Sequence, residues 1–142
     1  MGFETGVYLD VLVLRWPTPL VDDVEAMRKA LHGFSETRDA VHVMVVLPPQ
    51  RKALSPSVRD GLSQMLAALG GSCTTLCLVV EGDGFERAGV RAVAAATLAA
   101  EADRVFVTGS FTEALRHTQL PDMTQQTVMT YAKHDELVGQ RA

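Results

Sequence analysis

The chain has 142 residues, of which 47% are hydrophobic, 21% are charged and 6% are aromatic, and its formal net charge is −4. This length suits one domain, and a chain of this mass would bury about 68% of its unfolded surface, enough for a core without disulfides or a structural metal. The hydrophobic fraction excludes intrinsic disorder. The acidic balance, with a pI near 5.5, argues against a nucleic-acid-binding protein, which usually carries a basic face.

The sequence shows no pattern typical of a transmembrane helix or of a secretory signal. No stretch reaches the roughly 18 consecutive apolar residues of a transmembrane helix, and the first residues carry neither the basic nor the apolar segment of a secretory signal. Cys73 and Cys77 lie four residues apart in a strand-like segment, where ~13 Å between their Cα atoms exceeds disulfide reach. They also lack a CxxC or Cys/His spacing for zinc. We therefore expect a cytoplasmic protein with buried, reduced thiols and no bound metal.

Strand-like and helix-like patterns alternate along the chain. Residues 7–16 (VYLDVLVLRW) are largely apolar at both even and odd positions, which predicts a strand covered on both faces. Residues 3–7 are a candidate for a short extra strand that pairs with it through Gly6. Thr18 and Pro19 then predict the cap and the first residue of a helix. Apolar residues at spacings of three and four give this helix one hydrophobic stripe: Val21, Val24, Met27, Leu31 and Phe34.

Two further strands and a helix follow. Residues 41–47 (VHVMVVL) form the next predicted strand, and both its faces are apolar. After a polar loop, Ser55 precedes Pro56 as the predicted cap of a helix, which ends at Gly70. Residues 74–80 (TTLCLVV) then predict a third strand, again with apolar residues on both faces.

The last predicted unit is an alanine-rich helix over residues 85–102, followed by a short strand over residues 104–108 (RVFVT). Ser110 and Glu113 then form the capping box of a last short helix. The resulting order, βαβαβαβα, indicates an α/β layered domain with a mixed sheet of about four or five strands.

We expect this single domain to occupy residues 1–118. The remaining residues, 119–142, are polar with scattered apolar side chains. This composition leaves three alternatives for them: a docked helix, a mobile tail or a segment for interaction with a partner.

Ligands of open α/β sheets bind beyond the carboxyl ends of the parallel strands, where helix N-termini point. One candidate there is the turn after the third strand, where Glu81, Gly82, Asp83 and Gly84 precede Arg87. Its N–H groups could hold an anion such as a nucleotide or a phosphorylated metabolite. The turn has neither the third glycine of a dinucleotide fingerprint nor a Walker lysine, and its carboxylates would repel phosphate. The structural alternative is a tight turn with Asp83 as a helix cap.

A second candidate is the basic segment around the start of the second predicted helix. It contains Arg51, Lys52, Ser55, Ser57 and Arg59. Ser57 and Ser55 are candidate phosphoacceptors, because a phosphate at a helix N-terminus beside basic side chains is electrostatically favourable. The same segment could bind an anion. The structural alternative is N-capping by Ser55 with solvated basic neighbours.

Catalytic and metal-binding patterns are missing from the sequence. None of the 4 histidines has another His or a Cys at metal-ligand spacing, and there is no GxSxG nucleophile elbow. His42 lies inside a strand and is expected to be structural. Glu81 and Asp83 could form a general acid–base pair, but no substrate pocket accompanies them. We expect a protein that is not an enzyme and needs no cofactor.

The order of elements and a closing SxxEAL motif resemble the STAS domain of anti-sigma-factor antagonists and of the cytoplasmic tails of sulphate transporters. The motif consists of Ser110, Glu113, Ala114 and Leu115, and the resemblance covers residues 3–118. It implies a small, non-catalytic signalling domain. Such a domain binds a protein partner, a kinase or another regulator, through the surface around its second helix.

The family's phosphoacceptor is a serine at the start of that helix, after an acidic residue at the strand end and usually before glycine. Here the strand ends in LPP without a DxSG motif, and Ser55 and Ser57 are the nearest hydroxyls. The resemblance therefore implies a regulator with a modified or lost phosphoserine switch. Two alternatives remain open: a binder of, or enzyme for, a small anionic ligand at the turn of Gly82 and Gly84, and a self-associating protein, such as a homodimer joined through a sheet edge.

Overall fold

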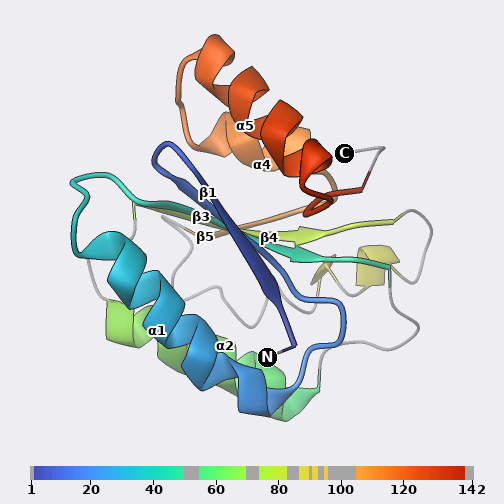
Figure 1. Cartoon of the computed structure of the whole chain (residues 1–142). Coiled ribbons are helices and arrows are strands. Elements are labelled where there is room, and N and C mark those ends of the chain that lie inside the picture. Colours follow the sequence, from blue (N-terminus) through green and yellow to red (C-terminus); the bar gives the residue numbers. More distant parts are fainter. Residues whose placement is uncertain are drawn as a thin grey trace.

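The chain folds into one mixed sheet with helices on both faces, and the computed structural model (Figure 1) describes residues 2–49, 55–69, 74–82, 87–89, 91–92, 95 and 105–139. The strands are β1 (Glu4–Tyr8), β2 (Val11–Arg15), β3 (His42–Leu47), β4 (Thr75–Val80) and β5 (Val105–Thr108). They lie in the order β1-β2-β3-β4-β5. β1 is antiparallel to β2, and every later pair is parallel. The predicted α/β class and the mixed sheet are confirmed.

The helices form a layer on each side of the sheet. They are the 3-10 turn η1 (Val21–Asp23), α1 (Val24–Ser35), α2 (Pro56–Leu69), α4 (Phe111–His117) and α5 (Asp122–His134). In Figure 1, α1 and α2 lie below the sheet, and α4 and α5 lie above it. The predicted alanine-rich helix over residues 85–102 falls mostly outside the described residues, although residues 87–89, 91–92 and 95 are helical.

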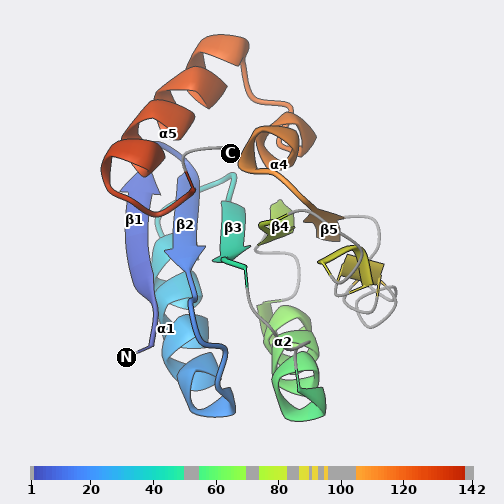
Figure 2. The ribbon, with the colours of Figure 1, turned by 90° about the vertical axis from the view of Figure 1, so that its right-hand side faces the viewer.

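The direction of the crossovers explains this division. The connections from β2 to β3 and from β3 to β4 each move the chain one strand in the same direction (Figure 2). Right-handed crossovers that proceed in one direction place their helices on one face. α1 and α2 therefore lie together, and the opposite face is covered by the chain that follows β5.

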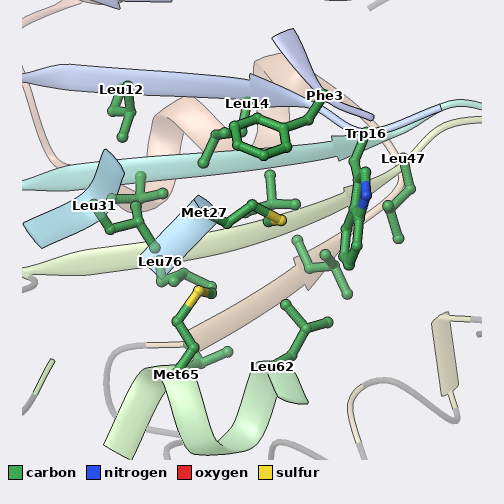
Figure 3. Packing of buried hydrophobic residues seen from close by; sticks show 14 of the residues in the cluster. Phe3, Leu12, Leu14, Trp16, Met27, Leu31, Leu47, Leu62, Met65 and Leu76 are labelled. Atoms are coloured by element: carbon green, nitrogen blue, oxygen red, sulfur yellow. The ribbon is translucent and has the colours of Figure 1, made fainter. Parts of the chain in front are cut away.

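The strands β2, β3 and β4 have apolar side chains on both faces, as their sequences predict, and alternate residues point to opposite sides. One side packs against α1 and α2 (Figure 3), and we call this cluster the α1–α2 core. Its largest members include Phe3, Leu12, Leu14, Trp16, Met27, Leu31, Leu47, Leu62, Met65 and Leu76.

The other side packs against α4, α5 and the residues after α5, and we call this cluster the α4–α5 core. The sheet contributes Val11, Val13, Met44, Val46, Cys77 and Val79. The cover consists of Phe111, Ala114, Leu115, Val128, Ala132, Leu137 and Val138. Of the three alternatives for the C-terminal segment, the structure therefore shows a docked helix. Cys77 is buried, as the strand pattern predicts, and its Sγ donates a hydrogen bond to the carbonyl of Ala114 at 3.6 Å. Cys73 lies outside the described residues.

The prediction of a single strand over residues 7–16 is wrong. The chain turns between β1 and β2 at Leu9 and Asp10, and Leu9 adopts a left-handed φ of 57° there. The sequence did not reveal this turn, because Leu9 is apolar like the strand residues around it, although its side chain is 59% exposed. The extra strand exists as β1, but it reaches β2 through this turn. Gly6 lies within the strand, opposite Val13.

The first helix also begins later than predicted. Thr18 precedes η1, and Asp23 occupies the N-cap position of α1 without a side-chain capping bond. The Asp23 carboxylate instead accepts hydrogen bonds from Trp16 Nε1 at 3.0 Å and from the backbone N–H of Gly2 at 3.1 Å. Val21 is therefore exposed rather than part of the stripe. The other predicted members of the stripe are buried or partly buried.

The importance of the α4–α5 core can be tested at Phe111, whose side chain is fully buried. We expect Phe111→Ala to lower the free energy of unfolding by about 3–5 kcal/mol, because it removes a large ring and leaves a cavity. Urea unfolding followed by circular dichroism measures the change. Met123→Ala, at a side chain that is 80% exposed, is the control and should shift stability by less than about 0.5 kcal/mol. Equal small effects would contradict the structural role of this core.

Candidate functional site

The carboxyl edge of the parallel strands has a partly buried ion pair that joins β2 to the end of β4, two strands that are not neighbours. Arg15 ends β2 and Glu81 follows β4, and their side chains lie 3.1 Å apart with only 20% and 12% exposure. Each also holds the segment after α5. Arg15 Nη1 donates to the carbonyl of Leu137 at 3.1 Å, and the N–H of Gly139 donates to Glu81 Oε2 at 2.6 Å. The pair therefore ties the C-terminal segment to the sheet.

Arg87 is buried at the same edge and bonds to the backbone. Its Nε donates to the carbonyl of Glu81 at 2.8 Å, and its Nη2 donates to the carbonyl of Pro48 at 3.2 Å. Burial lowers the pKa of this guanidinium, neighbouring Arg91 lowers it further, and Glu81 opposes both. Arg87 thus joins the chain ends that leave β3 and β4.

Arg91 has a similar role at the next strand of the sheet. Its Nη1 donates to the carbonyls of Val80 at 3.2 Å and Gly82 at 3.3 Å. A Cβ at Gly109 would lie 3.2 Å from this nitrogen, so the guanidinium also lies against the end of β5. Gly82 has a φ of 103°, which favours glycine, and this accounts for the first glycine of the turn.

The start of α2 holds the serines of the second candidate. The Oγ of Ser55 accepts a hydrogen bond from the N–H of Val58 at 3.3 Å, so Ser55 is the predicted cap. Ser57 is exposed in the first turn. Arg59 lies on a different side of the helix, because residues two apart do not face each other. Its Nε is buried and has no hydrogen-bond partner within the described residues.

The structure separates the predicted site residues into these two groups. Glu81, Gly82 and Arg87 meet at the carboxyl edge, whereas Ser55, Ser57 and Arg59 lie at the start of α2. The remaining predicted site residues lie outside the described residues: Arg51, Lys52, Asp83 and Gly84.

Sequence reasoning missed the contribution of Arg15 to the carboxyl edge. A signal was present, because Arg15 is the one charged residue of an otherwise apolar strand, β2. A charge at the end of a strand that is covered on both faces needs a buried partner. The identity of that partner, Glu81, depends on strand order and could not be obtained locally.

His42 is a hydrogen-bonded core residue at the opposite end of β3. Its Nδ1 lies 3.0 Å from the Oγ1 of Thr75, and the residue is 3% exposed. Burial lowers the pKa of this imidazole, and the charge of Asp10 opposes the shift. The position agrees with the structural role that the strand pattern predicts.

One open hollow lies away from both candidates, between α4 and α5. It measures about 410 Å³ and is lined by Thr112, Leu115, Asp122, Gln125, Gln126, Met129 and Thr130. Within the described residues, no group of three or more His, Cys, Asp or Glu side chains could hold a metal ion. No helix among those residues is long and apolar enough to cross a membrane.

No protein-family model, curated protein or solved structure matches this chain. The role of the candidate site is therefore inferred from the contacts that its own residues make. At the carboxyl edge these contacts pair opposite charges and satisfy the carbonyls at the ends of the strands. This arrangement holds the scaffold together.

The role of Arg87 can be tested by its removal. We expect Arg87→Ala to lower the free energy of unfolding by about 1–3 kcal/mol, because the carbonyls of Glu81 and Pro48 lose a buried donor. Urea unfolding measures this change. Arg28→Ala is the control, because Arg28 forms an ion pair with Glu25 on the surface of α1, and it should change stability little. Unchanged stability in Arg87→Ala would mean that the guanidinium is not needed by the fold.

A second test concerns His42 and pH. Since burial lowers its pKa in the folded state, the unfolded state binds a proton more readily between the two pKa values. Stability should therefore fall as the pH drops below about 6.5, the range in which a free histidine titrates. We expect His42→Gln to reduce this slope in unfolding measurements between neutral and mildly acidic pH. An unchanged slope in His42→Gln would contradict this role of His42.

Proposed function

We propose that this chain is a STAS-like regulatory module of the cytoplasm that binds a protein partner, a kinase or another regulator, and catalyses no reaction. The observation that carries the proposal is the state of the carboxyl edge, where charged side chains bond to one another and to strand ends. An active site needs a nucleophile or base that is aimed at a substrate. The charged side chains described at this edge instead form an ion pair and hydrogen bonds within the fold.

The arrangement of elements supports the same proposal. An antiparallel β1 precedes a parallel series from β2 to β5, with helices between strands where the connections are described. This is compatible with the order of elements on which the STAS resemblance rests. The N-cap half of the capping box predicted from the closing motif is also formed, since the Oγ of Ser110 accepts a hydrogen bond from the N–H of Glu113 at 3.1 Å.

The start of α2 is the surface that we expect the partner to contact, and Ser57 is the better candidate for a phosphoacceptor. Ser55 uses its hydroxyl oxygen as the cap, whereas Ser57 is exposed. A phosphate on Ser57 would add about −1.5 to −2 charges near the positive end of the helix dipole. The helix would tolerate this charge, and the surface that a partner contacts would become more negative.

Cross-linking tests whether a partner contacts this surface. A photo-cross-linking amino acid at position 57 of the full chain should capture a specific protein from an extract of the cells that make it. The same amino acid at Gln64, an exposed position further along α2, is the matched control and should not capture that protein. Capture at position 64 alone would contradict the assignment of the surface.

Charge substitutions test the switch once the partner is purified. We expect Ser57→Glu to weaken binding about tenfold or more, which corresponds to about 1.4 kcal/mol, and Ser57→Ala to bind normally. Gln64→Glu adds one negative charge on the same helix and should leave the Kd unchanged. Turnover of a small molecule by the purified chain, abolished in Ser57→Ala or Glu81→Gln, would overturn the proposal of a non-catalytic module.

A further inference from the structure

β1 is an edge strand, and its outer side pairs with no strand among those that the structure describes. It stands at one end of the strand order, and it is the outermost strand in Figure 2. Natural edge strands are usually protected by lysine, proline or a bulge. β1 has the sequence ETGVY and pairs with β2 without interruption, so it has no lysine, proline or bulge, and its one charged residue is Glu4 at its first position.

The backbone groups on this outer side can be assigned from the pairing of β2. The N–H of Trp16 donates to β3, and backbone groups alternate in direction along a strand, so those of Arg15 point to β1. Arg15 lies opposite Glu4 in the antiparallel register. Glu4 therefore points its backbone groups to β2, and Thr5 and Val7 point theirs outward. The edge offers two N–H groups and two carbonyls at these residues.

Exposed apolar side chains flank the edge on both faces of the sheet. Val7 lies opposite Leu12 of the α1–α2 core and is 51% exposed, and Leu9 in the turn is 59% exposed. On the other face, Tyr131 of α5 is 56% exposed and stacks on Tyr8 with ring centroids 6.4 Å apart. A strand added to β1 would find apolar surface on either side.

We propose that β1 pairs with β1 of a second copy of this chain, antiparallel about a two-fold axis at Gly6. The two sheets then form one continuous sheet. In this register Thr5 lies opposite Val7 of the second copy, and Val7 lies opposite Thr5 of that copy. Both are outward-pointing residues, so each pair exchanges two backbone hydrogen bonds.

The strand is complementary to itself in this register. Its one charged residue, Glu4, lies opposite Tyr8 of the second copy, so that no like charges face each other across the pair. Two β-branched pairs, Thr5 with Val7, form on the α1 side. Gly6 meets Gly6 at the axis, and a two-fold contact of this kind uses the same edge of both copies, so it closes as a dimer.

The proposal concerns a different surface from the start of α2 and does not depend on the proposed function. Sedimentation velocity of the full chain over a wide range of concentrations tests it directly. We expect a dimer that dissociates on dilution. A chain that stays monomeric at every concentration would overturn the proposal.

Two substitutions test the contact by different means. Val7→Lys places a charge in the new pair, and Thr5→Pro removes an outward N–H while the bonds to β2 remain. Each should raise the dimer Kd at least about tenfold, and circular dichroism checks that each variant is folded. Met123→Lys adds the same charge at an exposed apolar residue, 80% exposed at the start of α5, and should leave the Kd unchanged. Loss of the dimer in Met123→Lys alone would refute the β1 contact.

Disulfide trapping tests the register. Residues that exchange both hydrogen bonds have Cα atoms about 5.5 Å apart, within disulfide reach. The double variant Thr5→Cys with Val7→Cys should therefore form a covalent dimer on mild oxidation, at a rate well above that of the unsubstituted chain. Thr5→Cys alone, which lacks an opposite cysteine in this register, is the matched control. Equal cross-linking by the single and double variants would contradict the two-fold axis at Gly6.

Discussion

The apolar face of the sheet that α1 and α2 leave uncovered has to be buried by the chain that follows the last strand. Right-handed crossovers that advance in one direction put their helices on one side, yet β2, β3 and β4 are apolar on both sides. Each Å² of apolar surface left in water would cost about 25 cal/mol. The helices α4 and α5, together with Leu137 and Val138, cover this second face. The C-terminal segment is therefore an integral element of the fold.

The same requirement explains the carboxyl edge. The chain after α5 is held over the sheet by the partly buried pair of Arg15 and Glu81, which also forms hydrogen bonds with Leu137 and Gly139. Open α/β sheets commonly bind ligands at this edge. Here the charged groups described at the edge hold the scaffold, and we propose the start of α2 and the outer side of β1 as surfaces for interaction.

Much of the fold could be predicted, because the relevant signals are local. Continuous apolar runs marked β3 and β4, and Ser55 and Ser110 marked the starts of two helices through bonds made within one turn. The two wrong predictions, of the turn at Leu9 and of the start of the first helix, also have local causes. Leu9 placed an apolar side chain in an exposed, left-handed turn, where polarity is the usual signal. Thr18 offered a cap, but packing of Trp16 and its bond to Asp23 moved the helix start.

The sequence by itself determined the class of the domain, the identity of most of its strands and the serine caps, because periodicity and capping act between residues close in the chain. Only the tertiary structure decided what the candidate site residues do. Arg15 meets Glu81 across 66 residues, and Tyr8 donates to Asp135 across 127. Such partners follow from strand order and crossover handedness, since these decide which distant side chains come together.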